Sequence, residues 1–193
     1  MMYTIGDVQK GDKVLILGAS GGVGTCAVQL AKRVGCEVIA CASNQDKLDR
    51  LAGIGADHLI NYIEEDFMKA VWTKFGKPHR RRYDDGVDVV VNFTGGDTWV
   101  PGLRVLHRGG KVLTCGATAG YDPAEDLRFI WSYELKVLGA NGWMREDLTT
   151  LLDLLSDGSL KPVIDKTLPL EEVNEAFRML EDRVVFGKVV LTI

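Results

Sequence analysis

The fold is decided by the stretch VLILGASGGVG at residues 14–24. Its first four residues are apolar, which is typical of a strand buried on both faces, and the glycines after it indicate a tight turn. From Thr25 to Val34 apolar residues recur at helical spacing, so a helix follows the turn. Glycines let a backbone approach a pyrophosphate closely, and the N-terminus of a helix offers free N–H groups to it. The stretch therefore predicts dinucleotide binding.

Two glycine patterns overlap in this turn. Ala19, Gly21 and Gly24 fit the dinucleotide fingerprint with alanine in its first glycine position. Gly18, Gly22 and Gly24 fit the version found in short-chain dehydrogenases. That version needs a Tyr-x-x-x-Lys pair for proton transfer, and none of the five tyrosines has a lysine four places further on. The short-chain interpretation therefore lacks its catalytic residues.

The length, net charge and apolar content are those of an ordinary globular chain. At 193 residues it can bury one core, or form one domain plus an appendage. A net charge of −4 argues against nucleic acid as a partner, because phosphate neutralisation needs a basic face. No apolar run approaches the roughly 20 residues of a membrane span, and the first residues do not open a signal peptide. We expect a cytoplasmic protein without a membrane partner.

Neither a metal site nor a catalytic constellation is predicted. The four cysteines are far apart and form no Cys-x-x-Cys pair, so their spacing builds no zinc site. We expect them to be free thiols, buried in or beside the core. The three histidines are expected to begin a strand, to lie in a polar loop and to end a helix, and none has a partner at triad or ligand spacing. These residues are Cys26, Cys36, Cys41, Cys115, His58, His79 and His107.

The same polar loop, residues 76–86, carries Arg80-Arg81-Arg82. A run of three arginines is compatible with an anionic partner. A solvated surface loop is the interpretation that we favour.

Apolar strands alternate with helices along most of the chain. Near-continuous hydrophobic strands of this kind indicate a parallel sheet covered on both faces. The six units predict an α/β fold with the doubly wound strand order 3-2-1-4-5-6, and a ligand at the carboxyl ends of the strands. The six predicted strands are 13–17, 38–41, 58–61, 87–93, 111–115 and 135–138.

The regular alternation of buried strands and helices ends at Arg145. A helix over 146–155, a strand over 164–167, a helix over 171–180 and a terminal strand over 187–193 do not extend the six-stranded pattern. We therefore divide the chain into a dinucleotide-binding domain, residues 1–158, and a C-terminal return segment, residues 159–193.

Five stretches form a combination that is more specific than any one of them. They are GDKVLILGASGGVG at 11–24, GADHLINY at 55–62, GGK at 109–111, LKPVI at 160–164 and PLEE through FGKVV at 169–190. The combination resembles the cofactor-binding half of medium-chain dehydrogenases/reductases, in the branch of quinone reductases and zinc-type alcohol dehydrogenases. It spans nearly the whole chain.

The resemblance implies a longer enzyme. Members of this family are about twice as long as this chain, and their catalytic domain, with any zinc ligands, precedes the cofactor domain. On this basis we expect that this chain binds no zinc itself. We also expect that the segment 159–193 packs on a catalytic domain outside this chain, and that the chain alone has negligible turnover.

The resemblance also extends the candidate binding site. The glycine turn should hold the pyrophosphate, the ends of three later strands should border the nicotinamide, and a lysine near the C-terminus matches a family position that approaches the cofactor. These residues are Ala19, Ser20, Gly21, Gly22, Val23 and Gly24 for the turn, Thr94, Gly95, Cys115, Gly116, Ala117, Gly139, Ala140 and Asn141 for the strand ends, and Lys188.

The end of the second predicted strand favours NADP(H) over NAD(H). An NAD ribose is usually held by an acidic residue about 20 residues beyond the glycines, whereas Ala42, Ser43 and Asn44 stand there in this chain. Ser43, Lys47 and Tyr62 offer a hydroxyl, an ammonium and a phenol to a 2′-phosphate. Reductases that resemble this chain use a lysine and a tyrosine at the matching positions.

The leading hypothesis is the NADP(H)-binding domain of an oxidoreductase that transfers hydride between the nicotinamide and a small carbonyl, enone or quinone. The alternative is a dinucleotide-binding module without turnover. A methyltransferase of related fold is a weaker third hypothesis, because it would want an acidic residue where Ala42 and Ser43 stand. The strand over 135–138 should be a sheet edge with unpaired backbone groups. Enzymes that resemble this chain pair that edge across a two-fold axis, so we expect a homodimer.

Overall fold

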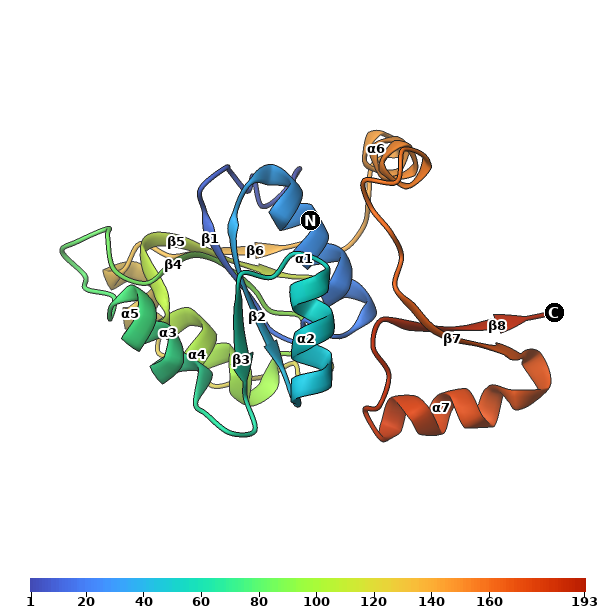
Figure 1. The fold of residues 1–193 in the computed structure, drawn as a ribbon. Helices are drawn as coiled ribbons and strands as arrows, with labels where there is room; N and C mark the ends of the chain where they lie inside the picture. Colours follow the sequence, from blue (N-terminus) through green and yellow to red (C-terminus); the bar gives the residue numbers. More distant parts are fainter.

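A parallel six-stranded sheet forms the centre of the computed structural model, which describes residues 1–193 (Figure 1). Its strand order is β3-β2-β1-β4-β5-β6, and every neighbouring pair is parallel. The predicted doubly wound order is therefore confirmed. The strands are β1 (Lys13–Ile16), β2 (Glu37–Ala42), β3 (His58–Asn61), β4 (Val87–Val91), β5 (Leu106–Thr114) and β6 (Lys136–Gly139).

Helices cover both faces of this sheet, and each face has its own hydrophobic core. Val14 and Ile16 belong to the core beneath α1 and α2, whereas Leu15 and Leu17 belong to the core beneath α3, α4 and α5. Because successive residues of a strand point to opposite faces, one unbroken apolar run supplies both cores. The helices are α1 (Gly22–Val34), α2 (Gln45–Gly53), α3 (Phe67–Phe75), α4 (Trp99–Arg104, preceded by the 3-10 turn η1, Gly96–Thr98) and α5 (Leu127–Ser132).

Several strand and helix boundaries differ from the prediction by one to five residues, and the largest difference is at the start of β5. Apolar residues at helical spacing predict a helix from Glu64 to Phe75. Helix α3 begins only at Phe67, because the Asp66 side chain accepts hydrogen bonds from the N–H groups of the first turn and caps it there. The strand predicted from Lys111 begins at Leu106. His107 consequently lies inside β5 and does not end a helix.

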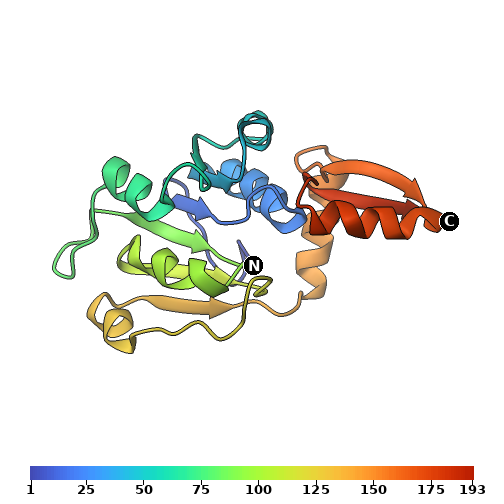
Figure 2. The same cartoon turned by 90° about the horizontal axis from the view of Figure 1, so that it is seen from below.

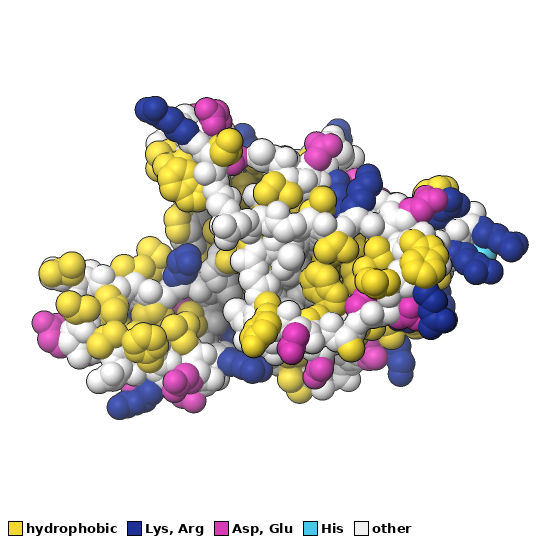
Figure 3. All heavy atoms as spheres, turned by 180° about the vertical axis from the view of Figure 1, so that it is seen from behind, with side chains coloured by type: hydrophobic (Ala, Val, Ile, Leu, Met, Phe, Trp, Pro, Cys, Tyr) yellow, Lys and Arg dark blue, Asp and Glu magenta, His cyan; other side chains and the backbone are white.

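The last part of the chain forms a second, smaller unit. A parallel two-stranded sheet, accompanied by one helix, lies to the side of the six-stranded sheet (Figures 1 and 2). Apolar side chains gather on this C-terminal unit (Figure 3), and its exposed large members are Ile164, Leu170, Phe177, Leu180, Val184 and Ile193. Large exposed apolar patches are typical of interaction sites. The elements are α6 (Arg145–Ser156), which leads into the unit, β7 (Ile164–Pro169), η2 (Leu170–Glu172), α7 (Val173–Glu181) and β8 (Lys188–Thr192).

Three further expectations concern the contacts of this chain with a second copy, with another domain and with a membrane. β6 lies at one edge of the large sheet, as expected, and pairing of this edge with a second copy stays a prediction. The division at residue 158 and the packing of the C-terminal unit on a preceding domain also stay predictions. None of the helices combines the length and the apolar character that a membrane span requires.

Two histidine–carboxylate pairs join neighbouring strands at the amino edge of the sheet. His58 Nε2 lies 2.6 Å from Glu37 Oε1 and joins β3 to β2, and His107 Nε2 lies 2.9 Å from Asp88 Oδ1 and joins β5 to β4. Asp88 also accepts a hydrogen bond of 2.7 Å from the backbone N–H of Lys13 in β1. Both side chains therefore connect neighbouring strands, and His58 begins its strand as expected.

A His107→Gln variant should lose stability in a pH-dependent way. The hydrogen bond to Asp88 raises the pKa of His107 above its usual value, although burial opposes the shift. A raised pKa means that the pair stabilises the fold fully below the unfolded pKa of about 6.5, and that this contribution disappears as the pH rises through the folded pKa. The difference in thermal midpoint between the natural chain and the variant should be larger at pH 6 than at pH 9.

The exposed His79 supplies the control for this comparison. His79→Gln should show no such pH-dependent difference. A difference for His107→Gln that stays constant or grows from pH 6 to pH 9 contradicts the role of the pair.

Candidate functional site

The glycine turn between β1 and α1 has the geometry of a phosphate-binding turn. Gly18 has a φ of +66°, in the left-handed region that favours glycine. A Cβ on Gly24 would lie 2.4 Å from the carbonyl oxygen of Gly18 and 2.5 Å from that of Ala19, so only glycine fits where α1 approaches β1. Gly21 precedes α1 and offers no side chain to cap it. The first N–H groups of α1 are therefore left for a ligand.

Lys188 lies against this turn. A Cβ on Gly22 would be 2.8 Å from Lys188 Nζ and 2.9 Å from its Cγ, which places the ammonium beside the first turn of α1. The backbone N–H of Gly187 donates a hydrogen bond of 2.8 Å to the carbonyl oxygen of Ser20 and fixes the start of β8 there. The structure thus brings Lys188 and the turn together from opposite ends of the chain. A cation at a helix N-terminus adds to its partial positive charge and favours an anion.

The ends of β2 and β3 bring Ser43 and Tyr62 to the same edge of the sheet. Ala42 pairs in register with Asn61, and the N–H of Tyr62 donates a hydrogen bond of 3.1 Å to the carbonyl oxygen of Ala42. Ser43 and Tyr62 each follow directly after these strands. The Tyr62 side chain is exposed and lines a cleft of about 580 Å³ at the carboxyl edge of the sheet.

Lys47 lies near this edge, but its side chain is already engaged. Only 6% of the residue is exposed, and its Nζ donates a hydrogen bond to the carbonyl oxygen of Arg183, in the segment between α7 and β8. Burial lowers the pKa of Lys47, while nearby Asp165 opposes the shift. The ammonium therefore meets a backbone carbonyl and does not stand in open solvent.

Arg183 is absent from the residues predicted from the sequence. Its φ of +56° is in the left-handed region, and it lines the same cleft as Tyr62. Its only sequence signal is its place four residues before the matched glycine and lysine near the C-terminus. The remaining lining residues come from the ends of β1, β2 and β4, from the start of α3 and from the loop after β5; they are Leu17, Gly18, Cys41, Phe67, Thr94, Thr98, Thr118 and Ala119.

Asn92 was also missed, and it shapes the loop after β4. The residue is fully buried, and its Oδ1 accepts hydrogen bonds from the backbone N–H groups of Thr94 at 3.1 Å and Gly95 at 3.0 Å. The carbonyl oxygen of Thr98 accepts a hydrogen bond of 3.3 Å from Asn92 Nδ2, and the Thr98 hydroxyl lies 3.3 Å from Asn92 Oδ1 while it donates a shorter bond of 2.7 Å to the carbonyl oxygen of Gly95. A single amide side chain thereby fixes the predicted residues Thr94 and Gly95. The available sequence signal for Asn92 was its position as a single polar residue directly after an apolar strand.

The loop after β5 lies directly against the loop after β4. The N–H of Ala119 donates a hydrogen bond of 2.7 Å to the carbonyl oxygen of Thr94. A Cβ on Gly95, whose φ is +68°, would lie 2.3 Å from the carbonyl oxygen of Gly120 and 3.0 Å from Cβ of Ala117. The predicted residues Thr94, Gly95 and Ala117 are thus held together by close backbone packing.

The remaining predicted residues stand at the same edge, outside the cleft. Cys115 and Gly116 follow β5 and are exposed. The expected burial of the Cys115 thiol is therefore wrong, because the residue comes after the strand has ended. Gly139 pairs with Thr114 of β5, and the N–H of Ala140 donates a hydrogen bond of 2.8 Å to the carbonyl oxygen of Thr114. The group Gly139 to Asn141 thus stands beside the end of β5.

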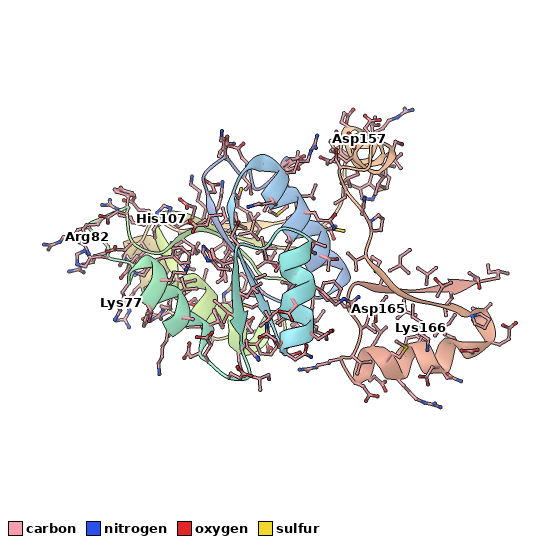
Figure 4. All side chains as sticks on the ribbon, viewed as in Figure 1. Lys77, Arg82, His107, Asp157, Asp165 and Lys166 are labelled. Atoms are coloured by element: carbon pink, nitrogen blue, oxygen red, sulfur yellow. The ribbon has the colours of Figure 1, made fainter.

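The arginine-rich loop lies at the opposite edge of the sheet. It precedes β4, and Lys77 and Arg82 project at the end of the molecule remote from the C-terminal unit (Figure 4). Arg82 pairs with Asp85 at 2.7 Å, and Lys77 Nζ lies 4.8 Å from the centre of a Trp72 ring. These charges are partly compensated by neighbouring side chains and take no part in the site at the carboxyl edge.

The donor set fits a dinucleotide. The tight turn and the uncapped helix offer backbone N–H groups to a pyrophosphate, Lys188 adds a positive charge, and the cleft beside Tyr62 and Arg183 extends the site along the sheet edge. No group of three or more His, Cys, Asp and Glu side chains is arranged to hold a metal ion.

Comparisons with known proteins agree with this fold. Residues 22–157 match the family model described as zinc-binding dehydrogenase. The chain is 32% identical over 190 residues to the acryloyl-coenzyme A reductase of Sulfurisphaera tokodaii, a match that covers 96% of this chain and 52% of that protein. A crystal structure of an NAD-dependent alcohol dehydrogenase superposes with a TM-score of 0.86 at 37% identity, over 97% of this chain and 52% of that one.

A second similar solved structure is a complex with two ligands. It is the 2-octenoyl-CoA carboxylase reductase CinF in complex with NADP and 2-octenoyl-CoA, with a TM-score of 0.82 at 30% identity, over 95% of this chain and 43% of that one. The chain spans about half the length of the relatives that it matches. The family model covers more than half of the chain and most of the six-stranded sheet. The chain belongs to the zinc-binding dehydrogenase family of the medium-chain dehydrogenase/reductase superfamily, and corresponds to its cofactor-binding fold.

Proposed function

We propose that this chain is the NADP(H)-binding part of an oxidoreductase that acts on a small carbonyl, enone or quinone substrate. The observation that carries the proposal is the glycine turn, where Gly24 leaves no room for a Cβ and Lys188 stands beside the start of α1. One relative is described as a reductase of acryloyl-coenzyme A and another as a reductase in complex with NADP and 2-octenoyl-CoA. These descriptions favour an activated double bond among the possible substrates.

The chain's own residues bind and orient the dinucleotide in this proposal. The turn from Ala19 to Gly24 and the ammonium of Lys188 hold the pyrophosphate. Thr94 and Gly95, fixed by Asn92, border the nicotinamide, as do the residues at the ends of β5 and β6. When bound, the nicotinamide supplies or accepts the hydride. No residue of this chain is assigned as a general acid or base.

We propose further that NADP(H) is preferred to NAD(H). The end of β2 carries Ser43 and no acidic residue, so no carboxylate of this strand end repels a phosphate. Tyr62 and Arg183 line the adjoining cleft and offer a phenol and a guanidinium to a 2′-phosphate, and Lys47 lies behind Arg183. One relative is described as NAD-dependent, so family membership alone does not decide the cofactor. The preference rests on these residues.

Titration of the purified chain with NADPH and NADH tests this proposal. We expect saturable NADPH binding that is at least about tenfold tighter than NADH binding, because a charge-assisted hydrogen bond to the 2′-phosphate contributes about 1.5–3 kcal/mol. Equal affinities contradict the NADP(H) preference. Binding of neither dinucleotide contradicts the site itself.

A dinucleotide-binding module without turnover is the second candidate. The exposed apolar side chains of the C-terminal unit, such as Phe177 and Leu180, favour it, because they mark a surface that this chain leaves uncovered. Hydride transfer also needs a second wall that positions the substrate and excludes water. Oxidation of NADPH by the chain in the presence of an enone, an enoyl thioester or a quinone supports the first candidate, and binding without oxidation supports the second.

A further inference from the structure

Helix α3 and the loop after it carry a concentration of positive charge. Residues 67–82 contain six lysines and arginines and no aspartate or glutamate, in a chain whose net charge is −4. Of these six, Arg82 is the one that pairs with acidic side chains, at 2.7 Å from Asp85 and 3.9 Å from Asp84. The others are exposed and form no ion pair; they are Lys69, Lys74, Lys77, Arg80 and Arg81. Their charge is therefore uncompensated within the chain.

The loop between α3 and β4 is fixed at both of its ends. The Tyr83 hydroxyl donates a hydrogen bond of 3.2 Å to Glu134 Oε2. The N–H of Gly86 donates a hydrogen bond of 2.8 Å to the carbonyl oxygen of Phe75, the last residue of α3. Because the backbone of the loop is already ordered, a partner that binds there loses little conformational entropy in ordering it.

A groove of about 620 Å³ lies beside the same helix, between α3 and the edge strand β3. Its floor is apolar, because the buried residues Ile39, Ile60 and Val71 line it. Lys69 and Lys74 of α3 line it as well. The uncompensated charge thus borders a concave and partly apolar surface.

The acidic side chains of the groove do not cancel this charge. Asp57 pairs with Lys32 at 2.5 Å, and Asp66 caps α3. Glu65 is exposed before the start of α3, whereas Lys74 lies in the last turn of the helix. A lysine in the last turn also complements the helix dipole, but the effect falls off beyond that turn and does not account for the arginines of the loop.

The shape of this surface distinguishes among anionic partners. A nucleic acid or an anionic membrane presents an extended charged surface, and most of the chain around this region is acidic overall. A recessed groove with an apolar floor suits the alternating side chains of an extended peptide. Helix α3 has nine residues and is about 14 Å long, a length that about four residues of extended chain span.

We propose that α3, the groove beside it and the following loop form a docking surface for an acidic, extended segment of a partner protein. Carboxylates of the segment meet Lys69, Lys74 and the arginines of the loop, and apolar side chains between them enter the groove. Complementary charge of this kind steers association and gives specificity. Lysine and arginine side chains gather at this end of the molecule (Figure 3), remote from the C-terminal unit, so the inference is independent of the proposed cofactor site.

Binding of a fluorescent peptide of alternating glutamate and leucine to the complete chain tests the inference. We expect saturable binding in fluorescence anisotropy that weakens as salt is added, because exposed charges are screened. Arg80→Glu combined with Arg81→Glu turns two attractions into repulsions and should lower the affinity about tenfold or more. Lys161→Glu combined with Lys166→Glu makes the same change in net charge at exposed lysines of the C-terminal segment, and should leave the affinity unchanged. All four positions are exposed, so both variants should keep the natural thermal midpoint.

Two further peptides separate the charge from the groove. Serine in place of leucine keeps the charge and removes the apolar contacts, and should weaken binding to the natural chain about tenfold. Glutamine in place of glutamate removes the charge and should abolish binding. These measurements need no variant of the chain and hold even where a variant fails to fold.

Several outcomes would overturn the inference. Absence of binding by the glutamate–leucine peptide overturns it directly. Equal losses for the arginine and the lysine double variants assign the binding to net charge alone, and equal affinity for the leucine and serine peptides shows that the groove is not occupied. Tighter binding of oligothymidylate, or of vesicles of phosphatidylcholine and phosphatidylserine, with the same loss in the arginine variant, assigns the surface to a nucleic acid or a membrane instead.

Discussion

A Gly24→Ala variant is expected to lose stability and dinucleotide binding together. The new Cβ would lie 2.4 Å and 2.5 Å from two backbone carbonyl oxygens, and no flexible side chain stands there to move away. Overpacking of a tight site costs up to about 3 kcal/mol, which lowers the thermal midpoint of a chain of this size by roughly 6–12 °C. Because α1 must shift relative to β1, its N–H groups leave the turn, and we expect NADPH affinity to fall by more than about 100-fold, the loss of more than one charge-assisted hydrogen bond.

Gly21→Ala is the matched control in the same turn. Its Cβ would meet nothing closer than the carbonyl oxygen of Gly18 at 3.5 Å, and its φ of −82° suits any residue. The thermal midpoint should therefore stay within about 2 °C of that of the natural chain, which corresponds to a change of about 0.5 kcal/mol in the free energy of unfolding. NADPH affinity should still fall, because the second glycine of the fingerprint lets the backbone approach the pyrophosphate. An unchanged midpoint for Gly24→Ala contradicts the packing explanation, and unchanged affinity for Gly21→Ala contradicts the place given to the pyrophosphate.

The sheet and the glycine turn were predictable because both are local. Each strand is a separate apolar run, and strand, turn and helix follow one another within residues 13–34. The strand order could then be inferred, since alternating strands and helices allow few topologies. Boundaries were less predictable. β5 begins early because Leu106 pairs with Val87 and His107 binds Asp88, and both contacts lie outside the local sequence.

The candidate site was only partly predictable, because much of it is built by the C-terminal segment where this segment comes back to the six-stranded sheet. Arg183 reaches the cleft beside Tyr62 after more than a hundred intervening residues, and nothing in its own neighbourhood indicates that destination. Lys188 was anticipated only through resemblance. Lys47 was predicted to contact a 2′-phosphate, but it has a carbonyl partner that belongs to the same returning segment. Local patterns find phosphate turns, whereas contacts between distant segments need the tertiary structure.

Replacement of Asn92 by alanine is expected to release the loop after β4. The change removes the acceptor for two backbone N–H groups and opens space at a fully buried position, whereas the Thr98 hydroxyl keeps its bond of 2.7 Å to the carbonyl oxygen of Gly95. Each unsatisfied buried group costs about 1–3 kcal/mol, so we expect a loss of about 3 kcal/mol and a midpoint lower by roughly 6–12 °C. NADPH binding should weaken as well, because Thr94 and Gly95 lose their fixed positions. Thermal unfolding and NADPH titration of the same preparation measure both effects.

Asn61 provides the comparison that isolates the network. It is also a buried asparagine at the carboxyl edge of the sheet, but its side chain accepts one hydrogen bond, of 3.2 Å, from the N–H of Ile63. Asn61→Ala should therefore cost only about 1 kcal/mol, which is roughly 2–4 °C in the midpoint. Equal losses for the two variants would mean that burial of the amide, and not the number of groups that it satisfies, determines the cost. A larger loss at Asn92, accompanied by weaker NADPH binding, identifies its side chain as the support of the nicotinamide-side loop.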